Sequence, residues 1–357
     1  MKLFSTRVSA VVTAVLLGAA AAGCSTASGG GGATAGGSNM PVVHGLETTN
    51  LVVDDFPAID SAGLYIAENE GLFAKEGLHV TVIPDFISSQ TTVDKIEAGK
   101  AQISGGDWVT YMNDFTGQDT NLEVISEGSV LQPNVLTLMT SPGSKVTSLR
   151  QLKGALLPVS GIHDIANLLI DSLLNDNNVP VDSVHYAPKT PLPKVPFMIA
   201  AGVFKAGPVP EPFVSMGEQQ VGDTVLADMD QGAMTNFPIV GYAVTKEWAQ
   251  QNPNTLKAFV TALDEGQQIA DTDRAAVEQA LAGPPLAIPK SVAAVISLPN
   301  FPSGINPTRI QRVVTNMIQF GFFSGKQLAA AKAFHAANVV YTDNLANASG
   351  VSNLLAG

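Results

Sequence analysis

The chain has 357 residues, with 19 lysines and arginines against 31 aspartates and glutamates, and a formal charge of -12 at pH 7. Binding a nucleic-acid backbone requires clustered basic side chains, so this acidic balance argues against a nucleic-acid partner. Cys24 is the one cysteine, which excludes disulfides and thiolate metal sites from the rest of the chain, so hydrophobic cores must hold the fold.

Residues 1–23 have the pattern of a secretory signal peptide. Lys2 and Arg7 precede a short apolar run that ends directly before Cys24. The run is shorter than the roughly 20 apolar residues that a membrane-spanning helix needs. With a cysteine in this place, the segment resembles the lipobox of bacterial lipoproteins, although Ala21 stands where that family usually has leucine. The resemblance implies cleavage before Cys24 and a lipid, such as palmitate, on its thiol.

An ordinary signal peptide followed by an incidental cysteine is the alternative interpretation. We favour lipidation of Cys24, because a free thiol on an exported protein would be prone to oxidation. Residues 25–40 are almost all Gly, Ser, Ala and Thr, a composition that predicts a flexible tether. We therefore expect a protein that works outside the cytoplasm, anchored by lipid to the bacterial cell membrane.

From Val42 to Met139, short apolar strands alternate with amphipathic helical stretches. The pattern predicts strands over residues 50–53, 79–84, 101–104, 122–125 and 135–139, and helices over residues 62–76 and 91–98. Gly77 suits a left-handed helix cap. Strands that alternate with helices predict a mainly parallel sheet, whose ligands gather at the carboxyl ends of the strands.

A second unit begins near Ser144. The pattern predicts helices over residues 148–153, 163–175 and 197–203, and strands over residues 155–159, 181–186 and 224–229. Four prolines in residues 188–196 exclude a regular helix there. From Phe237 we expect one more strand, over residues 239–244, and then helices from Trp248 to the end.

Two stretches of the first unit resemble one family, the substrate-binding proteins of ABC importers for nitrate, sulfonates, taurine and thiamine-pyrimidine precursors. Residues 62–80 are similar to the family's opening helix and the strand after it. Residues 94–107 resemble its step of a glycine followed by Asp-Ile-Ala, with Gln102 in place of the acid.

Two stretches of the second unit extend the same resemblance. Residues 149–154 resemble the helix that starts the family's second lobe. Residues 202–213 resemble its pattern G-x-x-D-A-x-x-x-x-E-P-F, with Lys205 in place of the aspartate. The likeness runs from about residue 50 to residue 254, and the order and spacing of the four stretches carry it.

The resemblance implies a two-lobed α/β fold, the periplasmic-binding-protein fold of type II, with mainly parallel sheets and two interlobe crossovers. Lobe I would comprise residues 41–138 and 238–357, and lobe II residues 139–237. It also implies capture of a small polar molecule between the lobes and its delivery to the permease subunits of an ABC importer. We expect a monomer that touches the membrane only through its lipid anchor, which keeps it close to the permease.

In this fold the ligand meets loops at strand ends and helix starts. The first such loop makes Asp54, Asp55 and Phe56 candidate ligand-binding residues. For Asp60 and Ser61, in the same loop, the expected role is to cap the helix that follows.

The second candidate loop is residues 104–108. Gly105 and Gly106 let the backbone approach a ligand closely, and Asp107 and Trp108 follow them. Two simpler roles remain open, since Asp107 could only cap the next helix and Trp108 could pack beneath it.

Across the expected cleft, residues 160–166 occupy the turn where nitrate- and sulfonate-type relatives offer helix-start N–H groups to an anion. This chain has His163 and Asp164 there, and an aspartate would occupy the positive helix end and repel an oxyanion. Glu211 adds another acid, although the family's common glutamate there is often structural. An acidic cleft favours a neutral or cationic, heterocyclic ligand over a simple oxyanion.

We expect no catalytic residues, no metal site and no cofactor, and hence no enzyme. The sequence has no G-x-S-x-G, phosphate loop or H-E-x-x-H motif, and its five histidines lack the spacing of a metal site. The family's pyrimidine-synthase relatives carry a cysteine-rich signature that is absent from this chain. A tethered ligand-sensing adaptor and an exported enzyme on the same scaffold remain the alternatives to import.

Overall fold

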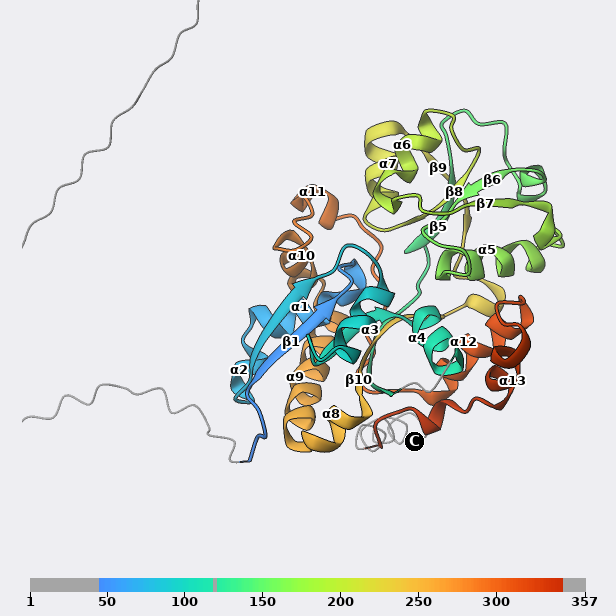
Figure 1. The fold of residues 1–357 in the computed structure, drawn as a ribbon. Coiled ribbons are helices and arrows are strands. Elements are labelled where there is room, and N and C mark those ends of the chain that lie inside the picture. Colours follow the sequence, from blue (N-terminus) through green and yellow to red (C-terminus); the bar gives the residue numbers. More distant parts are fainter. Residues whose placement is uncertain (1–44, 118–120, 343–357) are drawn as a thin grey trace, which may run out of the picture. The chain divides into compact units, whose positions relative to one another are not determined.

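The computed structural model describes residues 45–117 and 121–342 (Figure 1). The predicted signal peptide, Cys24 and the tether lie outside these residues. In the described part, strands gather in two main sheets, and helices cover each of them (Figure 1).

The first sheet has five strands in the order β2-β1-β3-β10-β4. Strands β1 to β4 run in one direction, and β10 is antiparallel to both of its neighbours. This arrangement is the mainly parallel sheet that the alternation of strands and helices predicted. The strand bounds are β1 Asn50–Asp55, β2 His79–Pro84, β3 Ile103–Asp107, β4 Leu122–Val130 and β10 Pro238–Thr245.

The second sheet has three strands in the order β8-β5-β9, and β5 is antiparallel to both neighbours. A short parallel pair, β6 and β7, lies in the same stretch of the chain. The antiparallel strand of each main sheet, β10 or β5, is the first strand that the chain forms after it arrives from the other sheet. The bounds are β5 Leu136–Thr140, β6 Leu156–Pro158, β7 His185–Ala187, β8 Gly207–Pro210 and β9 Thr224–Asp228.

The chain passes between the two main sheets twice, through residues 131–135 and residues 229–237. The N–H of Leu131 donates to the carbonyl oxygen of Phe237 over 2.7 Å, which joins the two passages. The two expected crossovers are therefore present. The expected lobe boundaries, 41–138 with 238–357 and 139–237, stay a prediction.

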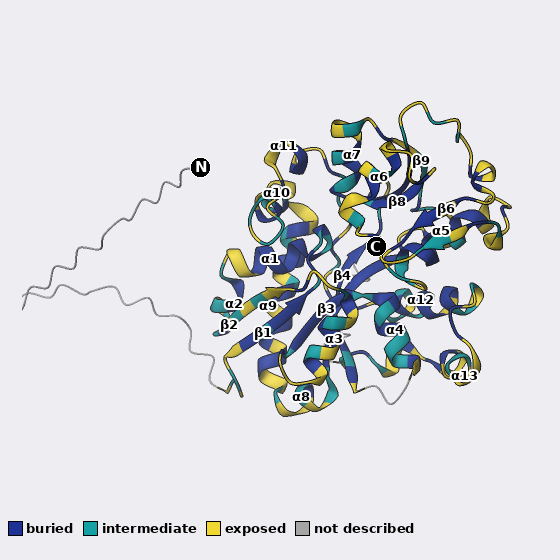
Figure 2. Cartoon of the chain, turned by 45° about the horizontal axis from the view of Figure 1, so that its top comes forward, coloured by how far each residue is buried: buried dark blue, intermediate teal, exposed yellow. Residues whose placement is uncertain are grey.

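Helices pack on the faces of both sheets, so that β1, β3, β4, β5 and β10 are mostly buried, whereas β2 and β9 are more exposed (Figure 2). Around the first sheet these are α1 Ala62–Asn69, α2 Leu72–Lys75, α3 Ser89–Glu97, α4 Trp108–Gly117, α8 Lys246–Gln251, α9 Pro253–Thr272, α10 Arg274–Ala282, α11 Lys290–Ala293, α12 Pro307–Gln319 and α13 Gly325–Ala333. Around the second sheet they are α5 Ile165–Asp176, α6 Val195–Ala200 and α7 Phe213–Val221.

Helices α1 and α9 pack closely because small residues meet at their contact. A Cβ added to Gly266 would lie 2.3 Å from the carbonyl oxygen of Gly63, so no larger residue fits there. The next residue, Gln267, donates its side-chain N–H groups to the carbonyl oxygens of Glu127 and Gly128, over 2.9 and 2.7 Å. This contact ties α9 to β4, the edge strand of the first sheet.

Glu127 also forms the most buried ion pair of β4. Its carboxylate accepts two N–H groups of Arg309, over 2.9 and 3.0 Å, and the backbone N–H of Asn306 over 2.6 Å. Burial raises the pKa of this carboxyl, and the arginine opposes that effect. The start of α12 is thereby held against β4.

Two sequence expectations for the first unit differ from the structure, and in the second unit the strand expected over residues 181–186 begins only at His185, after the 3-10 turn Val181–Ser183. The helix predicted over residues 62–76 is broken after Asn69, because Gly71 takes a left-handed conformation with a φ of 70° and α2 begins at Leu72.

The second difference concerns residues 104–107, which were expected as a loop and belong to β3. A Cβ on Gly105 would lie 2.1 Å from Asp55 Oδ1, and Gly106 pairs with Gly241 of β10. These glycines therefore serve close packing between strands, and the prediction that they admit a ligand to the backbone is not supported.

Candidate ligand-binding cavity

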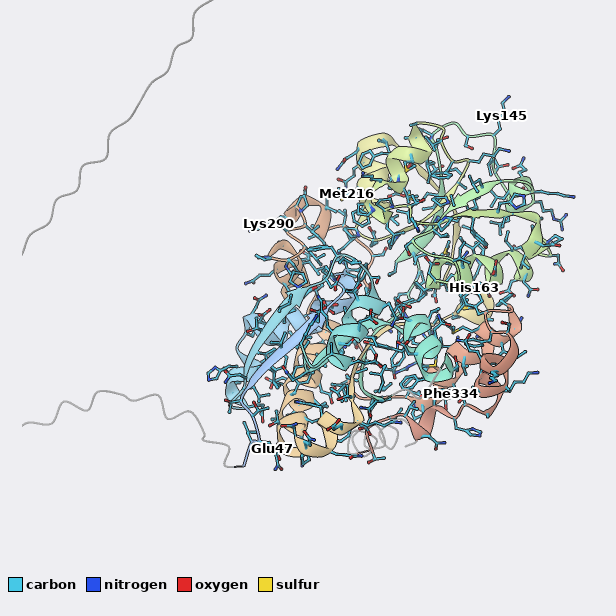
Figure 3. The ribbon with its side chains drawn as sticks, viewed as in Figure 1. Glu47, Lys145, His163, Met216, Lys290 and Phe334 are labelled. Carbon is cyan, nitrogen blue, oxygen red and sulfur yellow. The ribbon has the colours of Figure 1, made fainter. Side chains whose placement is uncertain are left out.

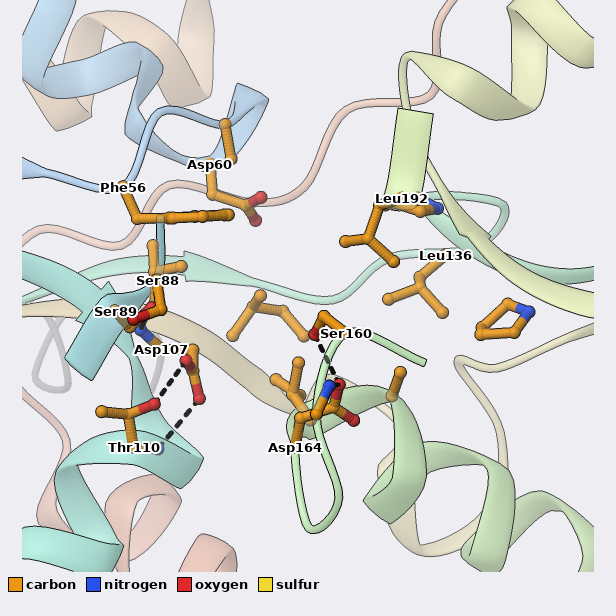
Figure 4. A pocket seen from close by; sticks show the side chains of 18 of the residues that line it. Phe56, Asp60, Ser88, Ser89, Asp107, Thr110, Leu136, Ser160, Asp164 and Leu192 are labelled. Atoms are coloured by element: carbon orange, nitrogen blue, oxygen red, sulfur yellow. Dashed lines mark hydrogen bonds between the residues drawn. The ribbon is translucent and has the colours of Figure 1, made fainter. Parts of the chain in front are cut away.

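A cavity of about 300 Å³ lies between the two main sheets. From the first sheet it is lined by the segment after β1, the 3-10 turn η1 (Ile59–Ser61), the start of α3, the junction of β3 and α4, and the start of β10. From the second sheet it is lined by β5, β8, the loop before α5, and Leu192 (Figure 4). It therefore occupies the place where the sequence predicted a cleft.

The cavity wall is mostly apolar, and its charged residues are all acidic. These are Asp60, Asp107, Asp164 and Glu211. No lysine, arginine or histidine belongs to the lining within the described part of the chain. An anion in this cavity would therefore meet like charges without a basic partner.

Asp107 caps α4. Its Oδ1 accepts the backbone N–H of Thr110 over 2.9 Å, and its Oδ2 accepts the hydroxyl of the same residue over 2.8 Å (Figure 4). Such a cap satisfies N–H groups that the first turn of a helix leaves free. The simpler of the two sequence interpretations thus applies to Asp107, although its side chain also lines the cavity.

Asp164 caps α5 in the same way. Its Oδ1 accepts the N–H of Asn167 over 2.9 Å, and its Oδ2 accepts the hydroxyl of Ser160 over 2.5 Å and the N–H of Gly161 over 2.9 Å (Figure 4). Burial raises the pKa of Asp164, and these donors oppose the rise. The positive end of α5 is therefore occupied by a carboxylate of the chain itself.

Glu211 joins segments that come from the two sides of the cavity. It accepts the N–H and the hydroxyl of Ser215, over 3.1 and 2.8 Å, and the N–H of Ser297 over 3.1 Å. Ser215 belongs to α7, whereas Ser297 follows α11. Burial raises the pKa of Glu211. Both oxygens of its carboxylate thus help to hold these two segments together.

Asp60 differs from the other three acids. Its Oδ1 accepts the hydroxyl of Ser129 over 2.5 Å, and the one further donor to its carboxylate is its own backbone N–H. Burial raises its pKa. Figure 4 shows its carboxylate pointing into the cavity beside the ring of Phe56.

The expected capping role of Asp60 and Ser61 is wrong. Neither side chain makes a capping hydrogen bond at the start of α1. The hydroxyl of Ser61 instead donates to Asp55 over 3.0 Å. The turn η1 orients Asp60 toward the cavity and Ser61 toward the interior of the first sheet.

Asp54 and Asp55 do not line the cavity, contrary to the sequence prediction. Asp54 pairs with Lys95 over 2.8 Å, and the same lysine contacts Asp85 over 2.9 Å. Burial raises the pKa of Asp54, while Lys95 opposes the rise.

Asp55, the last residue of β1, is buried. It accepts the hydroxyls of Ser61 and Tyr65 over 3.0 and 2.8 Å, and burial raises its pKa to about 7. Both aspartates at the end of β1 therefore have partners within the fold around this strand.

Trp108 and His163 also lie outside the cavity lining. The indole of Trp108 is fully buried and packs edge-on against Tyr111, with a ring-centroid distance of 5.8 Å. A Cβ on Gly241 would come within 2.3 Å of this indole, so β10 needs a glycine there. Packing beneath the helix, the alternative role of Trp108, is the one that the structure supports.

His163, labelled in Figure 3, is exposed. Its ring stacks on that of Phe322, at 4.7 Å between ring centroids and 25° between planes. Phe322 lies between α12 and α13, on the side of the first sheet. The contact therefore links the loop before α5 with the first-sheet side, outside the cavity.

Several residues that line the cavity were not among the sequence candidates. Ser88 and Ser89 follow the carboxyl end of β2, where the same rule of strand ends could have indicated them. Ile239 and Val240 lie in β10, whose position at the cavity depends on sheet order. Leu192 comes from the proline-rich residues 188–196, which give no periodic signal.

The described residues contain no group of three or more His, Cys, Asp or Glu side chains placed to hold a metal ion. Among the helices that the structure describes, none combines the length and the apolar character needed to span a bilayer.

The sequence pattern of one family, described as NMT1/THI5 like, matches residues 58–274. A curated relative, the bicarbonate transport ATP-binding protein CmpC of Synechocystis sp., is 26% identical over 235 residues. That alignment covers 62% of this chain and 35% of the relative, so the chain spans about a third of that longer protein.

Two solved structures share the fold at low sequence identity. The periplasmic nitrate-binding protein NrtA from Synechocystis PCC 6803 superposes with a TM-score of 0.67 and 18% identity, covering 86% of this chain and 89% of that one. The alkanesulfonate-binding protein SsuA from Xanthomonas axonopodis pv. citri, bound to MOPS, superposes with a TM-score of 0.66 and 14% identity, covering 83% of this chain and 99% of that one. The fold of the chain is therefore the periplasmic-binding-protein fold, as expected.

Proposed function

This chain belongs to the NMT1/THI5-like family, and we propose that it is an extracytoplasmic solute-binding protein that delivers a small molecule to an ABC importer. The observation that carries this proposal is the cavity between the two sheets. In α/β proteins, ligand sites often lie at the carboxyl ends of strands and at the interface between two domains. The nitrate-binding and alkanesulfonate-binding relatives have the same fold, and CmpC belongs to a bicarbonate transport system.

The proposed mechanism is closure of two lobes over the ligand. Lobe I would be residues 41–138 with 238–357, and lobe II residues 139–237. Contacts at Glu211 and between His163 and Phe322 join the two sides of the cavity, and support a closed arrangement. A ligand held by both sides would favour this arrangement over an open one, and the permease would recognise the closed form.

We further propose a neutral or cationic, heterocyclic ligand rather than a simple oxyanion. The lining has four acids and no basic residue among the described positions. The helix starts of α4 and α5, which could otherwise hold an anion, are capped by Asp107 and Asp164. These features support a ligand class different from the ones named for NrtA and SsuA.

We also propose lipidation of Cys24 after cleavage of residues 1–23, and a monomer tethered by residues 25–40. The test is metabolic labelling with palmitate in a bacterial host, comparing the natural chain with Cys24→Ala. Label and membrane association should both be lost in the variant. Equal membrane association of the two chains would contradict the anchor.

The test of the main proposal is a thermal-shift screen of the secreted chain against sulfonates, amines, pyrimidines and flavin precursors. A ligand at 100 times its dissociation constant stabilises a protein by about 2.7 kcal/mol, which a melting curve resolves. Uptake of the hit by cells with and without the gene then separates import from sensing. Chemical conversion of the hit by the purified protein would instead favour the exported-enzyme alternative.

A further inference from the structure

We infer that the ligand is an organic cation with an apolar body, and that Asp60 with Phe56 forms the subsite for its positive charge. This inference rests on the proposed function and makes it more specific. It depends on three features of the cavity, which are its size, the engagement of its acids, and the surroundings of Asp60.

The size and wall of the cavity define the body of the ligand. About 300 Å³ is at the lower end of the range for small-molecule sites, so the cavity suits a compact organic molecule rather than a peptide or a large cofactor. The wall that faces this space is formed mainly by aliphatic and proline side chains, such as Ile59, Leu136 and Pro208. A ligand that fills it must therefore present mostly apolar surface.

The acids of the cavity differ in how far the protein itself uses them. Asp107, Asp164 and Glu211 each accept hydrogen bonds on both carboxylate oxygens from groups of the chain. Asp164 and Glu211 accept three such bonds each, and both bonds of Asp107 come from Thr110 in the first turn of α4, so each of these carboxylates has a structural role in the fold.

Asp60 is the acid of this lining that caps no helix. A hydroxyl and its own N–H reach its carboxylate, and no basic side chain of the described residues is paired with it. A carboxylate removed from water without a cationic partner is costly, and a cation in the cavity would remove that cost. The position of Asp60 therefore points to a positive group of the ligand rather than to a structural partner.

Phe56 supplies a second interaction of the same kind. Its ring lines the cavity beside the carboxylate of Asp60 (Figure 4). The face of an aromatic ring attracts an ammonium or a cationic heterocycle, and this attraction grows when water is excluded. An acid and an aromatic ring on one short segment thus form a compact site for a monovalent organic cation.

The experiment compares three probes that share one apolar body, namely benzylammonium, benzyl alcohol and phenylmethanesulfonate. Calorimetry on the natural chain should give the order ammonium, then alcohol, then sulfonate, with at least about a tenfold step between the first two. In Asp60→Asn the advantage of the ammonium should fall to within about threefold, while the affinity for the alcohol should stay nearly unchanged.

Two further variants complete the test. Asp182→Asn removes the same charge from an exposed position in η3 (Val181–Ser183), outside the cavity, and should keep the full preference for the ammonium. Phe56→Leu keeps the wall apolar, but it should weaken binding of the ammonium probe more than binding of the alcohol probe. Melting curves of all variants show whether each is folded.

The outcomes separate this inference from the proposed function. A sulfonate that binds more tightly than the ammonium, or an ammonium preference that survives in Asp60→Asn, would overturn the inference and leave solute binding intact. If none of the three probes binds, the hits of the thermal-shift screen test the inference. A cationic hit would support it, and an anionic or neutral hit would overturn it. Absence of any small-molecule ligand would overturn both proposals.

Discussion

The two walls of the cavity use their acids differently. On the second-sheet side, Asp164 caps α5 and Glu211 holds α7 against the segment after α11, so both carboxylates are engaged by the chain. On the first-sheet side, Asp107 caps α4, whereas Asp60 caps no helix and accepts the hydroxyl of Ser129. The acids that line the cavity therefore have different roles. Three of the four acids stabilise the local fold, and we propose that the fourth, Asp60, binds the ligand.

The largest expected effect on the free energy of unfolding concerns Asp55, the last residue of β1, whose pKa is raised to about 7 by burial. The folded protein retains a proton there that the unfolded chain releases near pH 4. The free energy of unfolding is therefore not reduced by Asp55 below about pH 4. It falls as the pH rises from there to about 7, by at most roughly 4 kcal/mol.

In Asp55→Asn this part of the pH dependence should disappear. Urea unfolding of the natural chain and the variant at pH 4, 5, 6 and 7 measures it, and the difference between the two removes the contributions of other buried acids. A constant difference across this range would show that Asp55 is ionised throughout, and would contradict the raised pKa of this buried carboxyl.

The next effect concerns the second-sheet wall. Glu211→Ala leaves the donors of Ser215 and Ser297 without their acceptor, and should lower the free energy of unfolding by about 3 kcal/mol. Glu211→Gln is the matched control, since it keeps one oxygen acceptor and should cost less. A loss below about 1 kcal/mol for the alanine variant would contradict the bridging role.

A smaller effect is expected at the start of α5. Asp164→Ala removes the helix cap and should cost about 1 kcal/mol in the free energy of unfolding, whereas Asp164→Asn retains a capping oxygen and should cost little. Chemical denaturation of both variants measures the difference. Equal losses would indicate that the charge of Asp164, rather than its capping geometry, stabilises this wall.

The smallest expected effect is at the contact between His163 and Phe322. Ring stacking of this kind contributes about 0.5–1 kcal/mol, and here it joins the loop before α5 to the first-sheet side. Phe322→Ala should therefore weaken binding of the ligand found in the screen by about two- to fivefold, and His163→Ala should add nothing further in the double variant. Additive losses in calorimetry would show that the two rings act separately.

Much of the architecture could be predicted from local patterns. The strands after residues 50, 79 and 238 appear where apolar runs indicate them, because a buried strand must be apolar on at least one face. Asp164 and Asp107 precede helices and cap them, in keeping with the general preference of short acids for such positions.

The candidate site was predicted less well. Phe56, Asp107, Asp164 and Glu211 line the cavity, whereas Asp54, Asp55, Trp108 and His163 do not. Strand-end position alone could not separate these groups, because a side chain at the end of a strand points to either face of the sheet. Asp54 meets Lys95 of α3, and Asp55 meets Tyr65 of α1, partners that only the packing of helices on the sheet brings near.

The sequence by itself determined the alternation of strands and helices, the helix caps, and the acidic balance that argues against a nucleic-acid partner. These properties depend on neighbouring residues or on totals, so they can be read locally. Only the tertiary structure decided that Asp60, and not Asp55 five residues earlier, faces the cavity. The turn η1 rotates one carboxylate into open space, while Ser61 and Tyr65 enclose the other, and these partners meet only when helices and strands pack together.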